Sequence, residues 1–508
     1  MADISRRDFL KFMSLVPMAM LVHPILRTSG SMADPSQPNI IILILDTWSA
    51  DHMSMHGYPR QTMPNIEAFA QRAVVYHRHY STGTFTVPGT ASILTGLHPW
   101  SHRAISLGGE IAASHRQQQI FRAVSGTRST LGYSQNEFAD LLLNQAAQNL
   151  DTHVPVSSFS LQPGLFYSSP VFRNDAQVAY ASFEGDIFQR GVGFDGSLFI
   201  GPLRRLLAWR KRMALDADYQ MVYPRGLPTS TELFTLEDLV DGAIGILKNL
   251  HQPSLAYLHF FPPHGPYRPK GKHNHDFADG WQAPEKSLHP LASTTATYAE
   301  QESQRLKYDQ YLSSWDAELA RLLDYMKTSG LLQNSIFIIS SDHGELFERG
   351  EIGHNGPLIY DSVMHVPLII SRPGQGARVD VHSPTSSVDL LPTIASLAGA
   401  PAPAWGEGVL LPEFGGVPDE NRSIFAMDAK MNSVHAALKQ VSFSLTRNAH
   451  RLTYYQYPEL DYQQFELYDL VQDPDELRDL YLARPQMLAG LQQELLDKLA
   501  DVNKGYPV

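Results

Sequence analysis

The sequence predicts an α/β fold, with a large mixed, mostly parallel sheet sandwiched by helices and a small C-terminal antiparallel sheet plus one helix. Three observations support this fold class. Uniformly apolar runs have the composition of strands buried on both faces, at 39–45, 254–261, 335–340 and 366–371. Amphipathic helical segments alternate with these runs. Beyond about Arg422, short strands instead follow one another directly, as in an antiparallel sheet.

The helices and the remaining segments follow in chain order. Helical periodicity is clearest in four segments, which cover 63–72, 236–250, 308–332 and 386–400. A last helix is expected over 485–502, after the short strands. Residues 105–235 are rich in aromatic loops and show few long periodic segments, so we interpret them as substrate-side insertions.

The N-terminus resembles an export signal. Arg6 and Arg7 lie in "SRRDFLK", which matches the twin-arginine pattern, and a short apolar run follows over 12–22. That run is shorter than the roughly 20 residues that a membrane span needs. We therefore predict a twin-arginine signal peptide over 1–33, recognised by the twin-arginine export machinery, and a periplasmic or extracellular protein without a transmembrane helix in its mature chain. An uncleaved basic N-terminal anchor is the alternative.

Composition excludes several kinds of chemistry. The chain has no cysteine, so it has no disulfide, no thiolate metal ligand and no cysteine nucleophile. Its net charge is −12, which argues against non-specific binding to nucleic acid. A small anionic substrate would have to be attracted by local positive charge.

Two predicted buried strands are followed by residues of the types that commonly bind metal ions. Asp46 follows the first apolar run, and Asp342 and His343 follow a later one. Because parallel strands bring their carboxyl ends to one edge of a sheet, we expect these groups to meet there. Thr86 precedes a helix that begins within "TVPGTASILTG", and its hydroxyl could join them. Each residue alone has a simpler explanation, since an aspartate at a strand end usually caps the next helix. Together they suit a divalent cation, which would also lower the pKa of the Thr86 hydroxyl.

The order of these segments resembles the sulfatase family of the alkaline phosphatase superfamily over nearly all of residues 38–480. The matching segments are "PNIIILILDTWSADHMSMHGY", "MPNIEAFAQRAVVY", "TVPGTASILTG", "SSDHGELFERGEIGHNGPLIYDSVMHVPLII" and "FELYDLVQDPDELRDL". The resemblance implies a sulfatase-like catalytic domain over 38–420 and a C-terminal α+β subdomain over 421–508.

The resemblance also assigns roles to individual positions. Asp46, Asp342 and His343 fall where the family holds its metal ion, and Thr86 falls on the nucleophile. His264 in "PPHGPYRP" falls where a family histidine contacts the transferred group or the leaving oxygen. His354 in "GHNG" falls near a substrate-binding position.

Several positions depart from the family pattern. Thr47 follows Asp46 where sulfatases often have a second acidic residue, and Thr90 replaces the arginine of the nucleophile motif. The usual lysines are not evident, so Arg103 and Lys270 are candidates for the missing positive charge, unless they are ordinary surface bases. The imidazole of His343 in place of an amide shifts the expected ion from calcium towards manganese or zinc. We expect one divalent metal ion.

Threonine at the nucleophile position changes the expected chemistry. The family's cysteine is converted to a formylglycine hydrate, which expels sulfate by collapsing to an aldehyde, and a threonine ester cannot do this. A phosphothreonine can be cleaved by water attacking phosphorus. The sequence therefore predicts a metal-dependent hydrolase of a sulfate or phosphate ester, with phosphodiesterase or phosphonate chemistry favoured. A phospho-headgroup transferase, or a binding protein on a degenerate sulfatase scaffold, remains an alternative.

Overall fold

The computed structural model describes residues 37–161, 200–230 and 232–506. The predicted signal peptide over 1–33 lies outside these residues, so it stays a prediction. None of the helices in the described ranges has the length and apolarity needed to cross a membrane.

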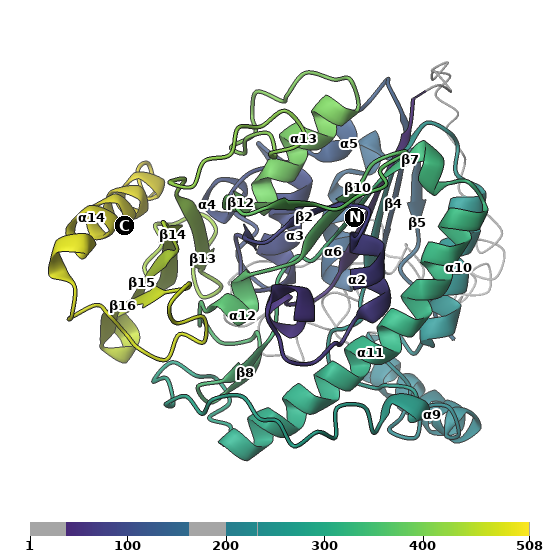
Figure 1. Ribbon diagram of the computed structural model, residues 1–508, viewed down its shortest axis with the longest axis horizontal. Helices are drawn as coiled ribbons and strands as arrows, with labels where there is room; N and C mark the ends of the chain where they lie inside the picture. The colour runs from purple at the N-terminus through teal and green to yellow at the C-terminus, as the bar shows by residue number, and fades with distance from the viewer. Residues whose placement is uncertain (1–36, 162–199, 231, 507–508) are drawn as a thin grey trace, which may run out of the picture. The chain divides into compact units, whose positions relative to one another are not determined.

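An eight-stranded sheet forms the centre of the fold (Figure 1), in the spatial order β11-β2-β10-β7-β1-β6-β4-β5. Its strands are β1 (Asn39–Leu45), β2 (Val74–Tyr76), β4 (Ser129–Ser134), β5 (Thr152–Val154), β6 (Ser254–Phe260), β7 (Ser335–Ser340), β10 (Leu368–Ser371) and β11 (Val379–Val381). All neighbours pair in parallel except β10, which is antiparallel to both β7 and β2. The predicted mixed, mostly parallel sheet is confirmed.

Helices cover both faces of this sheet, because the central strands are apolar on both sides. Ile41, Leu43 and Leu45 of β1 pack in one core with the helices α2 (Pro64–Ala70), α10 (Leu236–Lys248) and α11 (Tyr298–Thr328). The alternate side chains of β1 pack in a second core with α3 (Thr86–Thr95), α5 (Ile120–Ala123), α6 (Glu137–Gln145) and α13 (Leu390–Leu397). Short elements elsewhere are α4 (Pro99–His102), α12 (Asp361–Met364), β3 (His79–Tyr80), β8 (Leu346–Glu348), β9 (Glu351–Gly353) and β12 (Thr385–Ser386).

The C-terminal part is a four-stranded antiparallel sheet in the order β13-β14-β15-β16, with α14 (Pro485–Val502) packed against it (Figure 1). The strands are β13 (Ile424–Asp428), β14 (Val441–Arg447), β15 (His450–Tyr457) and β16 (Tyr462–Asp469). The predicted small antiparallel sheet with one helix is therefore confirmed.

Two details differ from the sequence prediction. The interval 105–235, expected to form substrate-side insertions, contributes β4 and β5 to the central sheet and also contains α9 (Ile200–Tyr219). Its strands are short, and Gly132 interrupts the apolar pattern of β4, so neither strand has the signal of β1. The long helix α11 begins at Tyr298, because Thr297 and Glu300 form a capping box there.

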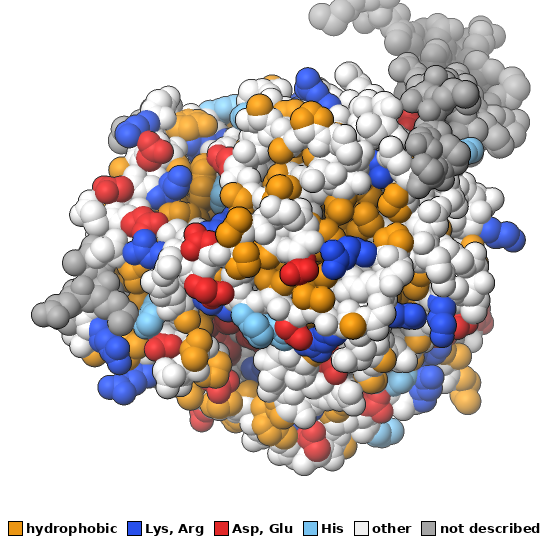
Figure 2. Space-filling model, turned by 45° about the horizontal axis from the view of Figure 1, so that its top comes forward, with side chains coloured by type: hydrophobic (Ala, Val, Ile, Leu, Met, Phe, Trp, Pro, Cys, Tyr) orange, Lys and Arg blue, Asp and Glu red, His pale blue; other side chains and the backbone are white. Residues whose placement is uncertain are grey.

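Charged side chains of both signs are scattered over the face drawn in Figure 2, with apolar side chains between them. No single sign dominates that face. Local basic groups near a site would therefore have to attract an anionic substrate.

Candidate active site

Three adjacent strands bring acidic and imidazole groups into one row at the carboxyl edge of the sheet. Ile44 of β1 is aligned with Ser340 of β7 on one side and with His259 of β6 on the other. Asp46 and Asp342 each lie two residues beyond the aligned pair, so both point to the same face as His259. All three side chains of this carboxylate row (Asp46, Asp342 and His259) are fully buried.

The predicted metal ligands meet in this row. One ligand atom from each of Asp46, Asp342 and His343 lies within 4.8 Å of the others. His343 donates from Nδ1 to the carbonyl oxygen of Gly344 at 2.9 Å, which leaves the lone pair on Nε2 in the neutral ring. That Nε2 lies 3.4 Å from Asp46 Oδ1 and 3.8 Å from Asp342 Oδ2.

The electrostatics of this cluster fit a bound cation. Burial and the Asp46 carboxylate raise the pKa of Asp342. Burial also opposes ionisation of Asp46, but hydrogen bonding and charge from His259, His343 and His264 outweigh it and hold the pKa of Asp46 well below its usual range. Burial opposes protonation of His343, but the carboxylates of Asp342 and Asp46 outweigh it and raise the pKa of His343 to about 9. Asp46 Oδ1 is buried with no hydrogen-bond partner among the described residues. A divalent ion would replace the proton on the imidazole and satisfy this oxygen, so the residues fit a divalent metal site.

Thr86 lies beside this cluster, as the sequence predicted. It is the first residue of α3, and its side chain is 4 % exposed. Its Oγ1 lies 3.4 Å from His343 Nε2 and accepts a hydrogen bond from Asn136 Nδ2 at 3.3 Å. The same Asn136 amide donates to Asp46 Oδ2 at 2.6 Å, so it links the hydroxyl to the carboxylate row.

Close packing holds α3 against the strand that carries Asp342. A Cβ atom on Gly89 would lie 2.3 Å from the backbone oxygen of Asp342, and Ser81 Oγ donates to the same oxygen at 2.5 Å. The chain therefore needs a glycine one turn after Thr86, for a steric reason.

Gly89→Ala should push α3 away from Asp342 and separate the hydroxyl from the carboxylates. We expect it to lower the free energy of unfolding by about 1–3 kcal/mol through overpacking, measured by urea unfolding. We also expect kcat/KM to fall at least about tenfold, because positioning is lost. Gly245→Ala in α10 is the matched control, since nothing lies within 4 Å of a Cβ there. Wild-type stability and activity in Gly89→Ala would show that the contact does not position Thr86.

His264 and His354 lie at the mouth of the site. They line two adjoining cavities of about 320 Å³ and 730 Å³, and Thr86 and Asn136 line the smaller one. His354 Nδ1 lies 2.8 Å from Glu345 Oε1, and its ring centroid is 4.9 Å from that of His264. Burial, together with the nearby rings of His343 and His264, holds the pKa of His354 well below its usual range, so His354 is a neutral polar group there.

The two basic candidates are not brought to this site. The guanidinium of Arg103 lies over the ring of Tyr506, 3.5 Å from its centroid, and donates to Ala436 O and Val502 O. The ammonium of Lys270 is paired with Glu237 at 2.5 Å and Glu318 at 2.8 Å. Arg103 is thus held by an aromatic ring and carbonyl groups, and Lys270 is neutralised by two glutamates. Neither residue lines the two cavities.

Three further residues near the site were not singled out in the sequence. Asn136 caps α6 after the weakly patterned strand β4. His259 is the one basic residue in the apolar run of β6, which was the available signal for it. Lys430, from the loop after β13, donates to Asn355 O at 2.7 Å, and its ammonium lies 4.8 Å from the ring centroid of Phe85. The ammonium is also paired with Asp428 Oδ2 at 3.2 Å, so this positive charge beside Phe85 is partly balanced by a carboxylate.

A second cluster of two carboxylates and a histidine has a structural explanation. Asp51, Asp361 and His365 lie close together, but the guanidinium of Arg451 binds Asp361. His365 holds Asp51 through Nδ1 at 3.2 Å and the carbonyl of His77 through Nε2 at 2.9 Å. Protein groups therefore already balance the charge of this cluster.

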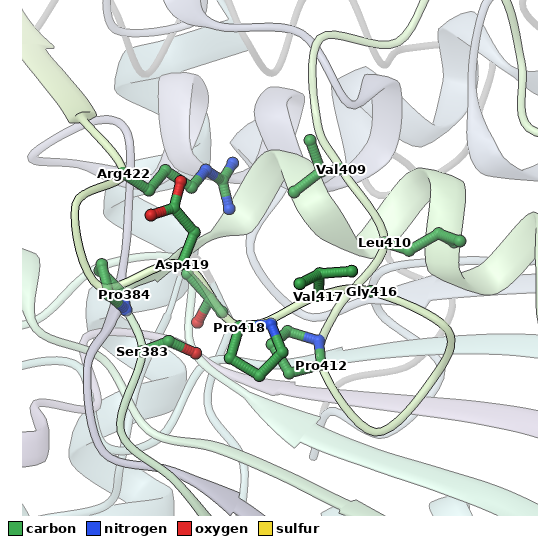
Figure 3. Close-up of a pocket in the computed structure, with 11 residues that line it drawn as sticks. Ser383, Pro384, Val409, Leu410, Pro412, Gly416, Val417, Pro418, Asp419 and Arg422 are labelled. Atoms are coloured by element: carbon green, nitrogen blue, oxygen red, sulfur yellow. The ribbon is translucent and has the colours of Figure 1, made fainter.

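A separate cavity of about 620 Å³ lies outside the candidate site (Figure 3). Its wall is largely apolar, with Val409, Leu410 and Val417 among the residues that line it. Arg422 also lines it, but its guanidinium binds both carboxylate oxygens of Asp389, at 2.5 and 2.7 Å. Neither Thr86 nor any residue of the carboxylate row lines this cavity.

Known proteins share both the sequence pattern and the fold. The sulfatase family model matches residues 38–152 and 208–400, and the model of the C-terminal part of N-sulphoglucosamine sulphohydrolase matches residues 350–505. The structure of a phosphonate monoester hydrolase from Silicibacter pomeroyi superposes with a TM-score of 0.62 and 21 % identity, over 92 % of this chain and 96 % of that one.

Two curated relatives differ in how much they cover. Arylsulfatase K from Bos taurus is 28 % identical over 231 residues, which are 42 % of this chain and 41 % of the relative, so the chain aligns with about two-fifths of its length. The ulvan-active sulfatase from Formosa agariphila is 23 % identical over 93 % of this chain and 82 % of the relative. The family model covers more than half of this chain, which confirms the resemblance stated from its motifs. The chain belongs to the sulfatase family of ester hydrolases.

Proposed function

We propose that this protein is a metal-dependent hydrolase that cleaves a phosphodiester or phosphonate ester through Thr86. One observation carries the proposal: a threonine hydroxyl lies between the Asn136 amide and the imidazole of His343, beside two buried aspartates. Asp46, Asp342 and His343 would hold a divalent ion. When bound, that ion supplies positive charge, which neutralises an anionic ester and lowers the pKa of the threonine hydroxyl.

The chain's own side chains do the rest of the first step. Thr86 loses its hydroxyl proton to solvent, its Oγ1 attacks phosphorus, the Oγ–P bond forms and the ester P–O bond breaks. His264 donates from Nδ1 to the carbonyl of Gly265 at 2.7 Å, so the proton it gives to the leaving oxygen is the one on Nε2. Asn136 holds the attacking oxygen in place.

Water completes the cycle. It attacks phosphorus on the Thr86 ester and gives one proton back to His264 Nε2, the Oγ–P bond breaks, and the phosphate or phosphonate product leaves. Thr86 Oγ1 then regains its proton from solvent. A sulfate ester of threonine lacks the second hydroxyl that lets a formylglycine hydrate expel sulfate. For this reason the threonine favours phosphorus esters over sulfate esters.

The larger cavity indicates the kind of leaving group. Arg225, Arg268 and Lys307 line it together with His264. Glu345 is the carboxyl in the same lining. Three basic side chains against one carboxyl favour a leaving group that carries its own negative charge.

A substrate panel tests this proposal. The metal-stripped protein is assayed on matched aryl sulfate, phosphate monoester, phosphodiester and phosphonate monoester substrates, with calcium, manganese or zinc added back. We expect the diester and the phosphonate to have the highest kcat/KM, and diesters with an anionic leaving alcohol to exceed neutral ones. Faster turnover of the aryl sulfate than of every phosphorus ester would contradict the proposal. Transfer to an added alcohol in place of water would favour the transferase alternative.

A further inference from the structure

His259 has a nitrogen aimed into the carboxylate row that no hydrogen bond explains. Its side chain is fully buried, and Nε2 has no hydrogen-bond partner among the described residues. That nitrogen lies 3.7 Å from Asp46 Oδ2 and 3.7 Å from Asp342 Oδ2. These distances are too long for hydrogen bonds. They match the roughly 3–4 Å that separates two ligands held about 2.1 Å from one ion.

The surroundings of the two ring nitrogens indicate which nitrogen of His259 carries the proton. The hydroxyl of Tyr257 lies 3.2 Å from Nδ1 and can accept a hydrogen bond from it. Nε2 is buried and has no hydrogen-bond partner among the described residues. The geometry therefore favours the neutral tautomer with the proton on Nδ1 and the lone pair on Nε2.

We infer that His259 Nε2 is a fourth protein ligand of the divalent ion, in addition to Asp46, Asp342 and His343. Tyr257 is a positioning residue that fixes its tautomer, as outer hydrogen-bond partners commonly do for metal-bound histidines. Thr90 instead donates to Asp342 Oδ2 at 3.2 Å and so orients one of the two carboxylates. A site with two imidazoles and two carboxylates favours manganese, zinc or cobalt over calcium and magnesium. This inference rests on the proposed metal site.

The experiment measures metal binding separately from activity. The full-length protein is stripped of metal and titrated with Co²⁺, following affinity by calorimetry and ligand geometry by visible absorption. We expect His259→Gln to weaken Co²⁺ binding by roughly a hundredfold and to change the spectrum. Tyr257→Phe should weaken it by roughly tenfold, because the ring loses the acceptor that orients it.

His79→Gln is the matched control. His79 is also a fully buried strand histidine, held through Nδ1 by Thr385 Oγ1 at 2.9 Å, but it is not part of the carboxylate row. It should change Co²⁺ affinity less than twofold. If His259 is instead a protonated counter-charge for the two aspartates, His259→Gln would leave Co²⁺ affinity unchanged or raise it, and the inference fails.

A measurement on the wild-type protein avoids dependence on the folding of a variant. Pulsed electron paramagnetic resonance of the Mn²⁺-loaded protein should show nitrogen couplings from two imidazoles. Couplings from a single imidazole overturn the inference but leave the proposed function intact. If the wild-type protein binds neither Co²⁺ nor Mn²⁺, both the inference about His259 and the proposed function fail.

Discussion

Thr86→Ala should lower kcat/KM for the preferred ester by at least about a thousandfold, while metal content stays at the wild-type level. In the proposed mechanism, the substitution removes the oxygen that forms the covalent bond to phosphorus. It leaves the carboxylates and His343 in place, because Thr86 contributes one hydroxyl at the first turn of α3. Steady-state kinetics and elemental analysis of the same preparation provide the two measurements.

Thr86→Ser is the matched control for this result. It keeps a hydroxyl at the same atom position, so it should retain activity within about a hundredfold of wild type. Unchanged turnover in Thr86→Ala would remove Thr86 from the mechanism. In that case a water molecule activated in the same cluster would become the nucleophile to test.

Asp342→Asn should abolish metal binding at stoichiometric metal concentration. The amide keeps the size of the side chain but removes a negative charge from a fully buried row, where an ion is held largely by charge. Bound metal, measured by elemental analysis after dialysis, should fall below about a tenth of an equivalent. Activity should fall in parallel and recover partly in excess metal.

The same variant has an opposite effect on the metal-free protein. Burial and the neighbouring Asp46 carboxylate raise the pKa of Asp342, so ionised Asp342 destabilises the metal-free fold at neutral pH. The apo variant should therefore melt at a higher temperature than the apo wild type, but it should gain nothing from added metal. Asp389→Asn is the control, because that aspartate is also fully buried but is paired with Arg422. It should lose stability and keep its metal. Full metal occupancy in Asp342→Asn would place the ion elsewhere.

Sequence patterns located the strands that carry the site because those strands are buried on both faces. β1 and β7 are continuous apolar runs, so the polar residues at their ends, Asp46 and Asp342, were visible against them. The strand β4 is as long as β7 but is less apolar and contains Gly132, and the helix after it begins at a residue with no distinctive pattern. Asn136 was therefore missed, although it contacts both Asp46 and Thr86.

Charged residues could not be assigned from sequence, because their role depends on partners distant in the chain. Arg103 is held by groups about 400 residues away, and Lys270 by glutamates on α10 and α11. Lys430 is close to the nucleophile loop only because the C-terminal sheet packs there. The motif match predicted the position of the Thr86 hydroxyl. The position of Lys430 near it depends on tertiary contacts, which the sequence does not show.

The small C-terminal sheet also holds the segment that precedes Thr86. Thr84 Oγ1 donates to Asp428 Oδ2 at 2.6 Å, and Met427 N donates to the carbonyl of Thr82 at 3.0 Å. Lys430, in the loop after β13, also donates to the carbonyl oxygen of His354. A truncated protein without the C-terminal sheet would therefore lose the contacts that hold the backbone before Thr86 and the loop of His354, so the two parts of the chain should be engineered together.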